Sequence, residues 1–597
     1  MTRKIFLYAI LLLCPCSLHA KADLSYRDVH PRLLMDGKDF TKLQKDIAKG
    51  DNEALLLLHA NQMAIADDAI GLQPLEYRKD ASNKRILAVS REAVKRLTAL
   101  SYAYRYTGDR KYLDAGEKVL RTVCTFPDWN PSHYLDTGEM SFAVAIGYDW
   151  MYEGLSEDTR ALIRKALREF AFDTSLRASF YGATNNWNQV CNGGLVCAAL
   201  GTLPPRDTCA ERIVSRAVET NIPAMEMYAP DGNYPEGPGY WAYGTQWEVL
   251  MLSAMESILG HDFGLSKSEG FLKTGAYQAW STGNSGKAFN FSDNGPNQGV
   301  NNPLWYFAYK TGDNSLVWRD VEMYRSGFRT GDRLLILAII YADKIGPIGD
   351  VTPKGRVYTG NGINPIAICR TGLGKGDLYL GVKGGTAKAN HAHMDIGSYV
   401  FDAYGTRWVS ELPYPAYAKS EVELKAMGGE LWAMGQNSMR WMVPGYNNRY
   451  HNTLTVNDKD HIVEGFAPIT ETFDADGRLG ATVDISEAFA GDLESAVRTL
   501  AIVDDSYLEV TDAIKASSGK DAAIRWTLVT EAIPTIDKDG ITLSKDGRKM
   551  RLTVSGVDAE YRQWPVNPEY KTFVTGFLFN MPAGSSRKVT VRLEPVE

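Results

Sequence analysis

The sequence predicts an α+β multidomain protein, with a helical N-terminal domain followed by a C-terminal antiparallel β-sandwich. Residues 23–345 carry apolar side chains at helical spacing, whereas residues 346–597 alternate short β-rich runs with Gly, Asp and Asn turns. A chain of 597 residues is also too long for one ordinary core. Helices and strands are therefore expected in two separate domains, with a ligand site in the crevice between them.

Residues 1–22 have the pattern of a secretory signal peptide. Arg3 and Lys4 precede an apolar run over residues 5–13, and small residues suitable for cleavage follow. The run is too short to cross a bilayer, and no later segment is predicted to do so. We therefore expect a secreted or periplasmic protein, with lipoprotein anchoring as the less favoured alternative.

The helical domain, residues 23–345, contains a weak internal repeat. Residues 106–112 and 309–314 both show a helix end, then Gly, then an Asp that begins a new helix. Repeated helix pairs of this kind suggest an α/α toroid around a central cleft. The clearest helical stripes lie over residues 91–104, 112–123, 140–152, 157–172 and 246–259.

The C-terminal domain, residues 346–597, has the texture of an antiparallel β-sandwich. Residues 541–544 and 550–554 flank a Lys-Asp-Gly-Arg turn and predict a hairpin. Further strands are predicted at residues 378–382, 399–403, 499–503, 507–510 and 525–529.

The charge of the chain bears on its possible partners, and its cysteine content bears on disulfide formation. The net charge is −7 and no long basic run occurs, which argues against a nucleic-acid partner. The five cysteines beyond the signal segment are odd in number and lie in apolar contexts. Buried free thiols are therefore favoured over a disulfide at Cys191 or Cys197.

Three histidines form the most informative pattern. His391 and His393 are one residue apart and precede the predicted strand 399–403, while His451 begins another predicted strand. If strand geometry reaches back to the pair, both side chains lie on one face. Two imidazoles on one face suit a metal ligand and a proton carrier.

Two loops upstream carry further polar groups. Five amide side chains crowd residues 185–192, more than the one or two that N-capping of a helix would use, so a functional role is favoured. Residues 231–243 contain Tyr234, Tyr240 and Tyr243 beside Glu236. Turn and core packing accounts for at least two of these tyrosines, which leaves one as a proton donor.

Taken in order, these segments resemble the heparinase II/III-like polysaccharide lyases over nearly the whole mature chain. Residues 30–34, 129–133 and 185–192 are most similar to the branch that holds oligoalginate lyases and exo-acting heparin or heparan sulfate lyases. The resemblance implies exolytic β-elimination on an anionic, uronate-containing polysaccharide or oligosaccharide. Heparin or heparan sulfate is the favoured substrate, and alginate is the runner-up.

The resemblance also implies catalytic roles. Asn186 would neutralise the substrate carboxylate, at a position where many relatives carry His. Tyr240 would donate a proton to the leaving oxygen, with Tyr243 in reserve, and His391 would face the substrate as the base. Neutralising the carboxylate stabilises the enediolate that develops when the neighbouring proton leaves.

A structural zinc is implied as well. His393, Glu411 and His451 would bind it, although the relatives carry Asp where Glu411 stands. Asp395 is the alternative ligand, or a partner that orients a histidine.

Further side chains are predicted to bind substrate. Guanidinium groups suit carboxylate or sulfate, although surface exposure is the ordinary role of single arginines. The predicted binding residues are Asn188, Asn192, Glu236, Tyr243, Arg440 and Arg449.

Two other functions stay open at this stage. Toroids also carry glycoside hydrolases, which need two carboxylates, and Glu236 with Asp293 could form that pair. A non-catalytic sugar-binding protein would leave the His, Tyr and Asn groups without a role. Ultraviolet absorbance of the product separates elimination from hydrolysis, because only elimination creates an absorbing double bond.

Overall fold

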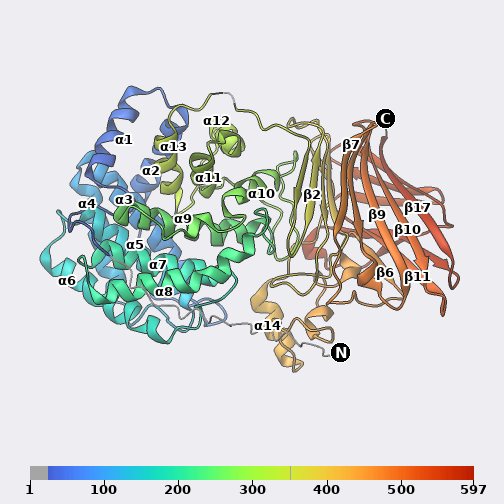
Figure 1. The fold of residues 1–597 in the computed structure, drawn as a ribbon, viewed down its shortest axis with the longest axis horizontal. Coiled ribbons are helices and arrows are strands. Elements are labelled where there is room, and N and C mark those ends of the chain that lie inside the picture. The colour runs from blue at the N-terminus through green and yellow to red at the C-terminus, as the bar shows by residue number, and fades with distance from the viewer. Residues whose placement is uncertain (1–23, 350, 597) are drawn as a thin grey trace, which may run out of the picture.

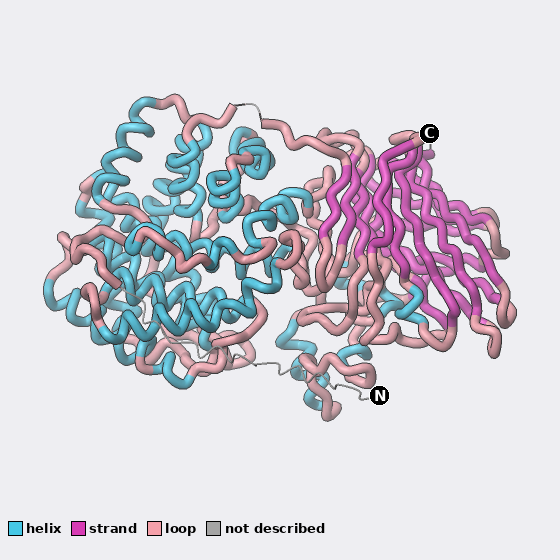
Figure 2. Tube along the Cα trace, in the orientation of Figure 1, coloured by secondary structure: helices cyan, strands magenta, loops and turns pink. Residues whose placement is uncertain are grey.

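The computed structural model of the protein describes residues 24–349 and 351–596, so the predicted signal peptide lies outside the described residues. A helical region comes first and antiparallel sheets follow, as Figures 1 and 2 show. The last helix before the sheets ends at Ile345 and the first strand begins at Val357. The predicted succession of a helical part by a strand part is confirmed.

The helices of the helical part are closely packed around a buried pair, α5 and α7. Every residue of α5 is buried, and a Cβ on Gly194 of α7 would overlap the carbonyl oxygen of Gly138 in α5. Glycine is therefore required for this close approach. The helices are α1 (Gly37–Lys49), α2 (Glu53–Ile70), α3 (Leu87–Thr107), α4 (Arg110–Cys124), α5 (Tyr134–Met151), α6 (Glu157–Ala166), α7 (Asn186–Thr202), α8 (Thr208–Met225), α9 (Pro238–Leu259), α10 (Thr274–Trp280), α11 (Pro303–Thr311), α12 (Trp318–Arg325) and α13 (Leu335–Ile345).

The repeat predicted at two helix ends is present in the structure. Gly108 ends α3 at φ 73° and Gly312 ends α11 at φ 72°, both in the left-handed region that favours glycine. Asp109 then caps α4 by accepting from a backbone N–H, and Asp313 caps a short 3-10 turn in the same way.

The strands form three antiparallel sheets. The strands of the first sheet are β1 (Val357–Gly360), β2 (Ile366–Arg370), β3 (Tyr379–Lys383), β4 (Tyr399–Ala403) and β5 (Thr406–Val409), in that order. The second sheet, ordered β12-β13-β14-β17-β10-β9-β8-β7, comprises β7 (Ile469–Ala475), β8 (Arg478–Asp484), β9 (Leu493–Val503), β10 (Tyr507–Ala516), β12 (Ile533–Asp537), β13 (Gly540–Lys545), β14 (Arg548–Ser555) and β17 (Ser586–Val596). The third, ordered β15-β16-β11-β6, comprises β6 (Leu454–Val456), β11 (Ala522–Thr530), β15 (Glu560–Trp564) and β16 (Phe573–Met581).

The three sheets share one apolar core. Phe401 of the first sheet, Leu500 of the second and Trp526 of the third are buried in the same cluster. The predicted hairpin is confirmed, because β13 pairs with β14 across a turn in which Lys545 faces Arg548. A further helix, α14 (Tyr417–Ala426), is inserted in the strand part and lies at its junction with the helical part (Figure 1).

Two further predictions concern the cysteines and membrane-spanning helices. All five cysteines among the described residues are buried and unpaired, as expected. No described helix combines the length and apolar character that a membrane span needs.

Candidate active site

A cavity of about 690 Å³, here called the Tyr240 cavity, lies between the helical and strand parts. Residues distant in sequence meet there, because helices, a long loop and α14 all reach the same junction. Its lining includes Asn186 and Trp187 of α7, Tyr240 and Tyr243 of α9, Asp293 and Asn294 of the loop 281–302, His391, and Tyr414, Tyr417 and Trp432 around α14.

Tyr240 is positioned by the first turn of α9. Gly237 precedes the helix at φ 88° and Pro238 occupies its first position, where no backbone N–H is needed. A Cβ on Gly239 would overlap the side chain of Asn294, so glycine admits the loop that forms the opposite wall. The sequence Gly-Pro-Gly thus places the tyrosine ring against the cavity.

Tyr240 and His391 form one connected group with Tyr417. The rings of Tyr240 and His391 stack with centroids 4.0 Å apart. The Tyr240 and Tyr417 hydroxyl oxygens are 2.7 Å apart, and the Tyr417 hydroxyl lies 3.3 Å from Nδ1 of His391. Burial raises the pKa of both tyrosines well above the ordinary value. Each hydroxyl therefore keeps its proton at neutral pH and is available as a hydrogen-bond donor.

The prediction that strand geometry aligns the histidines is wrong. Strand β4 begins only at Tyr399, and His391 lies in a turn with φ 58°, a left-handed conformation that is uncommon outside glycine. A carboxylate aligns the pair instead. Asp293 Oδ2 lies 2.8 Å from Nδ1 of His391, and its Oδ1 lies 2.9 Å from Nε2 of His393.

Asp293 fixes the state of His391. Burial alone would raise the pKa of this carboxyl, but hydrogen bonds from His391 and His393 and the charges of His393 and Arg440 hold it well below its usual range. An ionised carboxylate can only accept, so it keeps a proton on Nδ1 of His391. The other ring nitrogen, Nε2, is then the basic one.

The asparagine cluster divides into supporting and cavity-lining members. Asn185 caps α7 by accepting from the backbone N–H of residue 187 at 3.1 Å. Asn188 is fully buried and donates to two backbone carbonyls, and Asn192 donates to the Asn188 side chain. Neither Asn188 nor Asn192 lines the Tyr240 cavity, so their predicted substrate contact is replaced by a structural role.

Asn186 lines the cavity at the first turn of α7, and the capping residue Asn185 lines it as well. Only 4% of Asn186 is exposed. A Cβ on Gly244 would overlap the side chain of Gln189 and lie 3.3 Å from Cβ of Asn186, so α9 passes closely beside this turn. Asn186 and Tyr240 are thereby brought to one cavity by two neighbouring helices.

The surroundings of Glu236 do not support its predicted role in substrate binding. Glu236 is buried, does not line the Tyr240 cavity, and accepts a hydrogen bond from Asn390 at 2.8 Å. Burial raises the pKa of its carboxyl. Asp293 does line the cavity, but both of its oxygens accept from histidines. The pair of free carboxylates that a glycoside hydrolase would use is therefore not formed by these two residues.

The two predicted arginines also lie elsewhere. Arg440 is fully buried, lies 3.6 Å from Asp293 and donates to two backbone carbonyls behind the cavity wall. Arg449 forms ion pairs with Asp458 at 2.7 Å and Asp460 at 2.5 Å. Neither lines the Tyr240 cavity, and Arg440 instead stabilises the charge of Asp293.

Cationic groups that sequence reasoning missed do line the cavity. Arg85 and Arg91 both contribute to its wall. The guanidinium of Arg91 lies 4.8 Å from the centroid of the Tyr243 ring and 3.1 Å from the buried carboxylate of Glu139. Glu139 also accepts from the Tyr243 hydroxyl at 2.9 Å. Tyr243 therefore lines the cavity with its hydroxyl already held by a carboxylate.

Tyr417 and Trp432 were missed as well. Trp432 packs edge-on against His391 at 5.3 Å and against Tyr417 at 5.0 Å between ring centroids. Both belong to the α14 region, where the sequence shows no motif and a helix is inserted among strands. The one sequence signal for this part of the site was Tyr417, which begins an isolated helical segment.

Of the three residues predicted to bind zinc, His451 contacts Glu411 and lies beside His393. His451 Nδ1 is hydrogen-bonded to Glu411, and the rings of His393 and His451 lie 5.3 Å apart. Nε2 of His451 is buried and has no hydrogen-bond partner among the described residues. His451 also lies before β6 rather than at its start. Within residues 24–349 and 351–596, no three His, Cys, Asp or Glu side chains converge as a set of metal ligands.

Asp395, the alternative ligand, is paired with a cation. Its Oδ1 lies 2.7 Å from Nζ of Lys383, and both side chains are buried. Burial would raise the pKa of Asp395, but the charges of Lys383 and the nearby histidines lower it.

A family model for the heparinase II/III-like C-terminal domain matches residues 368–577. The fold is similar to that of heparinase III, with a TM-score of 0.59 at 13% identity over 90% of this chain and 85% of that one. It is also similar to a mutant heparan sulfate lyase from Pedobacter heparinus, with a TM-score of 0.60 at 14% identity over 94% of each chain. No curated protein sequence matches the chain. The family resemblance predicted from the sequence is confirmed for residues 368–577, and at these identities the structural likeness shows the fold alone.

Proposed function

We propose that this chain, whose C-terminal part belongs to the heparinase II/III-like family, is a lyase that cleaves a uronate-containing polysaccharide by β-elimination. The helical part would form an α/α toroid and the strand part a β-sandwich, with the substrate bound between them. Secretion or export to a periplasm suits an enzyme that meets a polymer outside the cytoplasm. The sequence pattern of residues 1–22 supports that location.

The chemistry sets three requirements. The proton on C5 of a uronate is weakly acidic, because the adjacent carboxylate is already negative. Hydrogen bonds or a cation at that carboxylate stabilise the enediolate that develops. A base must remove the C5 proton, and an acid must protonate the oxygen that leaves C4.

The connected group of Tyr240, Tyr417 and His391 is the observation that carries the proposal. Tyr240 is protonated and lines the cavity, so it can donate to the leaving oxygen. His391 carries its proton on Nδ1 toward Asp293, which leaves Nε2 as the nitrogen that accepts the C5 proton. Tyr417 bridges the two groups and orients the Tyr240 hydroxyl.

Asn186 is proposed to neutralise the substrate carboxylate. Its amide can donate hydrogen bonds to the carboxylate oxygens but cannot transfer a proton. This division leaves acid and base work to Tyr240 and His391. The place of Asn186 beside Tyr240 in the same cavity supports the assignment.

Heparin or heparan sulfate is the proposed substrate, with alginate as the runner-up. Arg85 and Arg91 on the cavity wall can bind sulfate or carboxylate groups. Aromatic rings at half-buried Trp187 and exposed Trp432 offer apolar faces to sugar rings. These groups suit an anionic sugar chain and would bind neutral polysaccharides poorly.

Exolytic action is proposed from the walls of the cavity. The loop residues Asp293 to Gly295 and the aromatic residues of the α14 region line it on the side of the strand part. A cavity of about 690 Å³ accommodates a few sugar units rather than a long chain. A chain end would then enter and short products would leave.

Zinc binding by His393, Glu411 and His451 is part of the proposal. Two imidazoles and a carboxylate are a donor set that zinc accepts, and the buried, unpartnered Nε2 of His451 is a free donor. A bound zinc would brace this wall of the site as a structural ion.

Incubation with a panel of uronate polysaccharides tests the function. Ultraviolet absorbance of the products should rise on heparan sulfate, heparin or alginate, because elimination forms an unsaturated uronate. New reducing ends without absorbance would mean hydrolysis and would overturn the proposal. The absence of both on every polymer in the panel would favour a sugar-binding protein.

A further inference from the structure

A second cavity, of about 1090 Å³, lies at the same junction and is here called the Arg370 cavity. It is lined by α10, α12, the linker before β1, the end of β2 and loop residues 282–286, and it shares no described lining residue with the Tyr240 cavity. In Figure 1, α12 lies at the upper side of the junction and α14 at the lower side. The two cavities are therefore separate sites.

Arg370, at the end of β2, is a buried cation without a counter-charge. Only 6% of the residue is exposed, and its guanidinium lies 3.5 Å from the centroid of the Trp280 ring. One terminal nitrogen is buried without a hydrogen-bond partner, and no described carboxylate forms an ion pair with it. Burial lowers the pKa of Arg370 to about 10. Burying a charged guanidinium without a counter-charge is energetically unfavourable. We therefore expect Arg370 to bind an anion.

Arg319 of α12 faces the same cavity from the helical part. Its Nε is buried and unpartnered among the described residues, and one terminal nitrogen donates to the carbonyl of Gly286 at 3.4 Å. The acidic side chains of the lining are already engaged, since Glu322 pairs with Arg325 and Asp313 caps a turn. Two guanidiniums from the two halves of the chain are thus left for one anionic group.

The rest of the lining suits a sugar rather than a bare ion. Trp318 is half-buried and offers an indole face, and Ser285 and Asn284 contribute a hydroxyl and an amide. The cavity is large enough for several sugar units, whereas an inorganic ion would fill a small part of it. Aromatic, hydroxyl and guanidinium groups together match a sugar ring that carries a carboxylate or sulfate.

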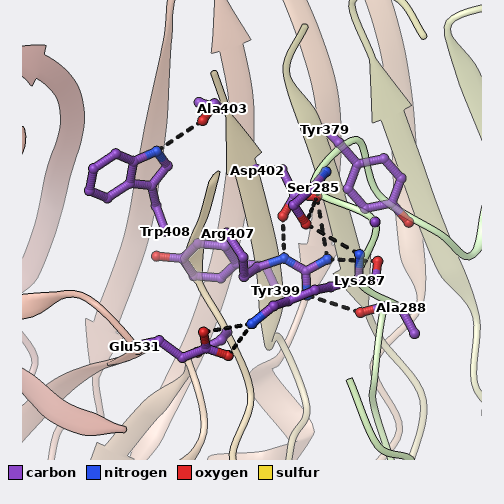
Figure 3. A network of polar contacts seen from close by, with 12 residues as sticks. Ser285, Lys287, Ala288, Tyr379, Tyr399, Asp402, Ala403, Arg407, Trp408 and Glu531 are labelled. Atoms are coloured by element: carbon purple, nitrogen blue, oxygen red, sulfur yellow. Dashed lines mark hydrogen bonds and ion pairs between the residues drawn. The ribbon is translucent and has the colours of Figure 1, made fainter. Parts of the chain in front are cut away.

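The loop that forms one wall is held in place by buried charges (Figure 3). Asp402 accepts from the backbone N–H of Ser285 at 3.0 Å and from its hydroxyl at 2.7 Å, and it pairs with buried Arg407. Arg407 also donates to the carbonyl of Ala288 at 2.9 Å. A wall fixed in this way loses little conformational freedom when a ligand binds.

We propose that the Arg370 cavity is a non-catalytic binding site for an anionic oligosaccharide, whose carboxylate or sulfate lies between Arg319 and Arg370. The choice of a uronate-containing sugar rests on the proposed function. The site would hold a length of the polymer on the enzyme while the Tyr240 cavity acts on a chain end.

Calorimetric titration with a heparin tetrasaccharide tests the site at physiological ionic strength. The protein carries Tyr240→Phe to limit turnover during the measurement. Two binding sites per chain are expected. Arg370→Gln and Arg319→Gln should each weaken one of them by at least about tenfold and leave the other unchanged. Arg110→Gln, a matched change at an exposed ion pair on α4 that lines neither cavity, should bind like the parent.

Further measurements separate the outcomes. The melting temperature of Arg370→Gln should change little, because the loss of stacking on Trp280 is offset by the removal of a buried charge that lacks a counter-charge. No binding by the parent, or unchanged binding in both arginine variants, would overturn the proposal. Inorganic sulfate that binds this site as tightly as the tetrasaccharide would show an inorganic-anion site and also overturn it. Arginine-dependent binding by a wild-type protein that cleaves no polysaccharide would refute the lyase proposal alone and leave this site standing.

Discussion

The proposed reaction depends most on the hydroxyl group of Tyr240. Its raised pKa, the stacking on His391 and the contact with Tyr417 all favour a neutral proton donor. The ring itself contributes packing that a mutation need not disturb. Removing the hydroxyl while keeping the ring is therefore the cleanest test of acid catalysis.

Tyr240→Phe should lower kcat by at least about 100-fold, the contribution expected of a general acid. Steady-state rates followed by ultraviolet absorbance measure the loss. Tyr309→Phe, at an exposed tyrosine on α11, is the control and should retain wild-type rates. Near-normal turnover by folded Tyr240→Phe protein would exclude Tyr240 and turn attention to Tyr417 and Tyr243.

His393 tests the proposed zinc. Elemental analysis of purified protein should find about one zinc per chain, and His393→Ala should lose it. Because the ion is proposed to be structural, the variant should also melt at a lower temperature. Full activity and unchanged melting after treatment with a chelator would argue against a zinc site. Loss of activity at unchanged melting temperature would point to a catalytic metal instead.

At the scale of elements, the packing of α5 against α7 places the asparagine turn. Gly194→Ala would push a methyl group into the Gly138 carbonyl, and overpacking of this kind costs roughly 1–3 kcal/mol or more. Chemical denaturation should show that loss in the free energy of unfolding. Gly37→Ala on α1, where a Cβ would meet nothing within 4 Å, is the matched control and should be neutral or slightly stabilising. Equal stabilities for the two variants would contradict the packing argument.

Glu248 on α9 gives the helical core a dependence on pH. Burial raises its pKa from 4.5 to about 8, so the folded state holds a proton that the unfolded state has released. Stability from this group is present below about pH 4.5 and is lost as the pH rises toward 8. Glu248→Gln should therefore melt above the wild type by at least a few degrees at pH 8, with a smaller difference at pH 5. Scanning calorimetry at both pH values measures this, and a pH-independent difference would rule out the titration.

The elements themselves could be predicted where a local signal exists. The helical stripes, the Gly108 and Gly312 helix ends and the hairpin of β13 and β14 follow from periodicity, left-handed glycine and turn chemistry, which act within a few residues. The His391 turn could not be predicted in this way, since its left-handed backbone has no sequence signature. The His-x-His pattern was interpreted as an alternating strand, and that prediction was wrong.

The site was predictable only in part, for a related reason. Asn186, Tyr240 and His391 stand in unusual local clusters, and all three line one cavity. Asp293 and Tyr417 act through contacts with residues 98 and 177 positions away, respectively. Such contacts depend on how the two halves of the chain dock, and a single sequence carries no periodic pattern that reports it.

For the whole molecule, the proposed exolytic mode predicts the products. Size-exclusion chromatography of early reaction samples should show short unsaturated sugars from the first turnovers, with the polymer shortened only slowly. This is expected if the residues 293–295 and the α14 region, which line the Tyr240 cavity, leave room for a chain end and not for the middle of a chain. An early ladder of mid-length fragments would show endolytic cleavage and would defeat the argument from shape.

The carboxylate of Asp293 has a consequence for assembly. It belongs to the helical half of the chain, whereas the two histidines that it holds belong to the strand half. The proposed general base, His391, is thus held with its proton on Nδ1 only after both halves have folded and met. On this proposal, a nascent or partly unfolded chain would carry all the proposed catalytic side chains and still be inactive. Activity would therefore report that the two halves are correctly joined.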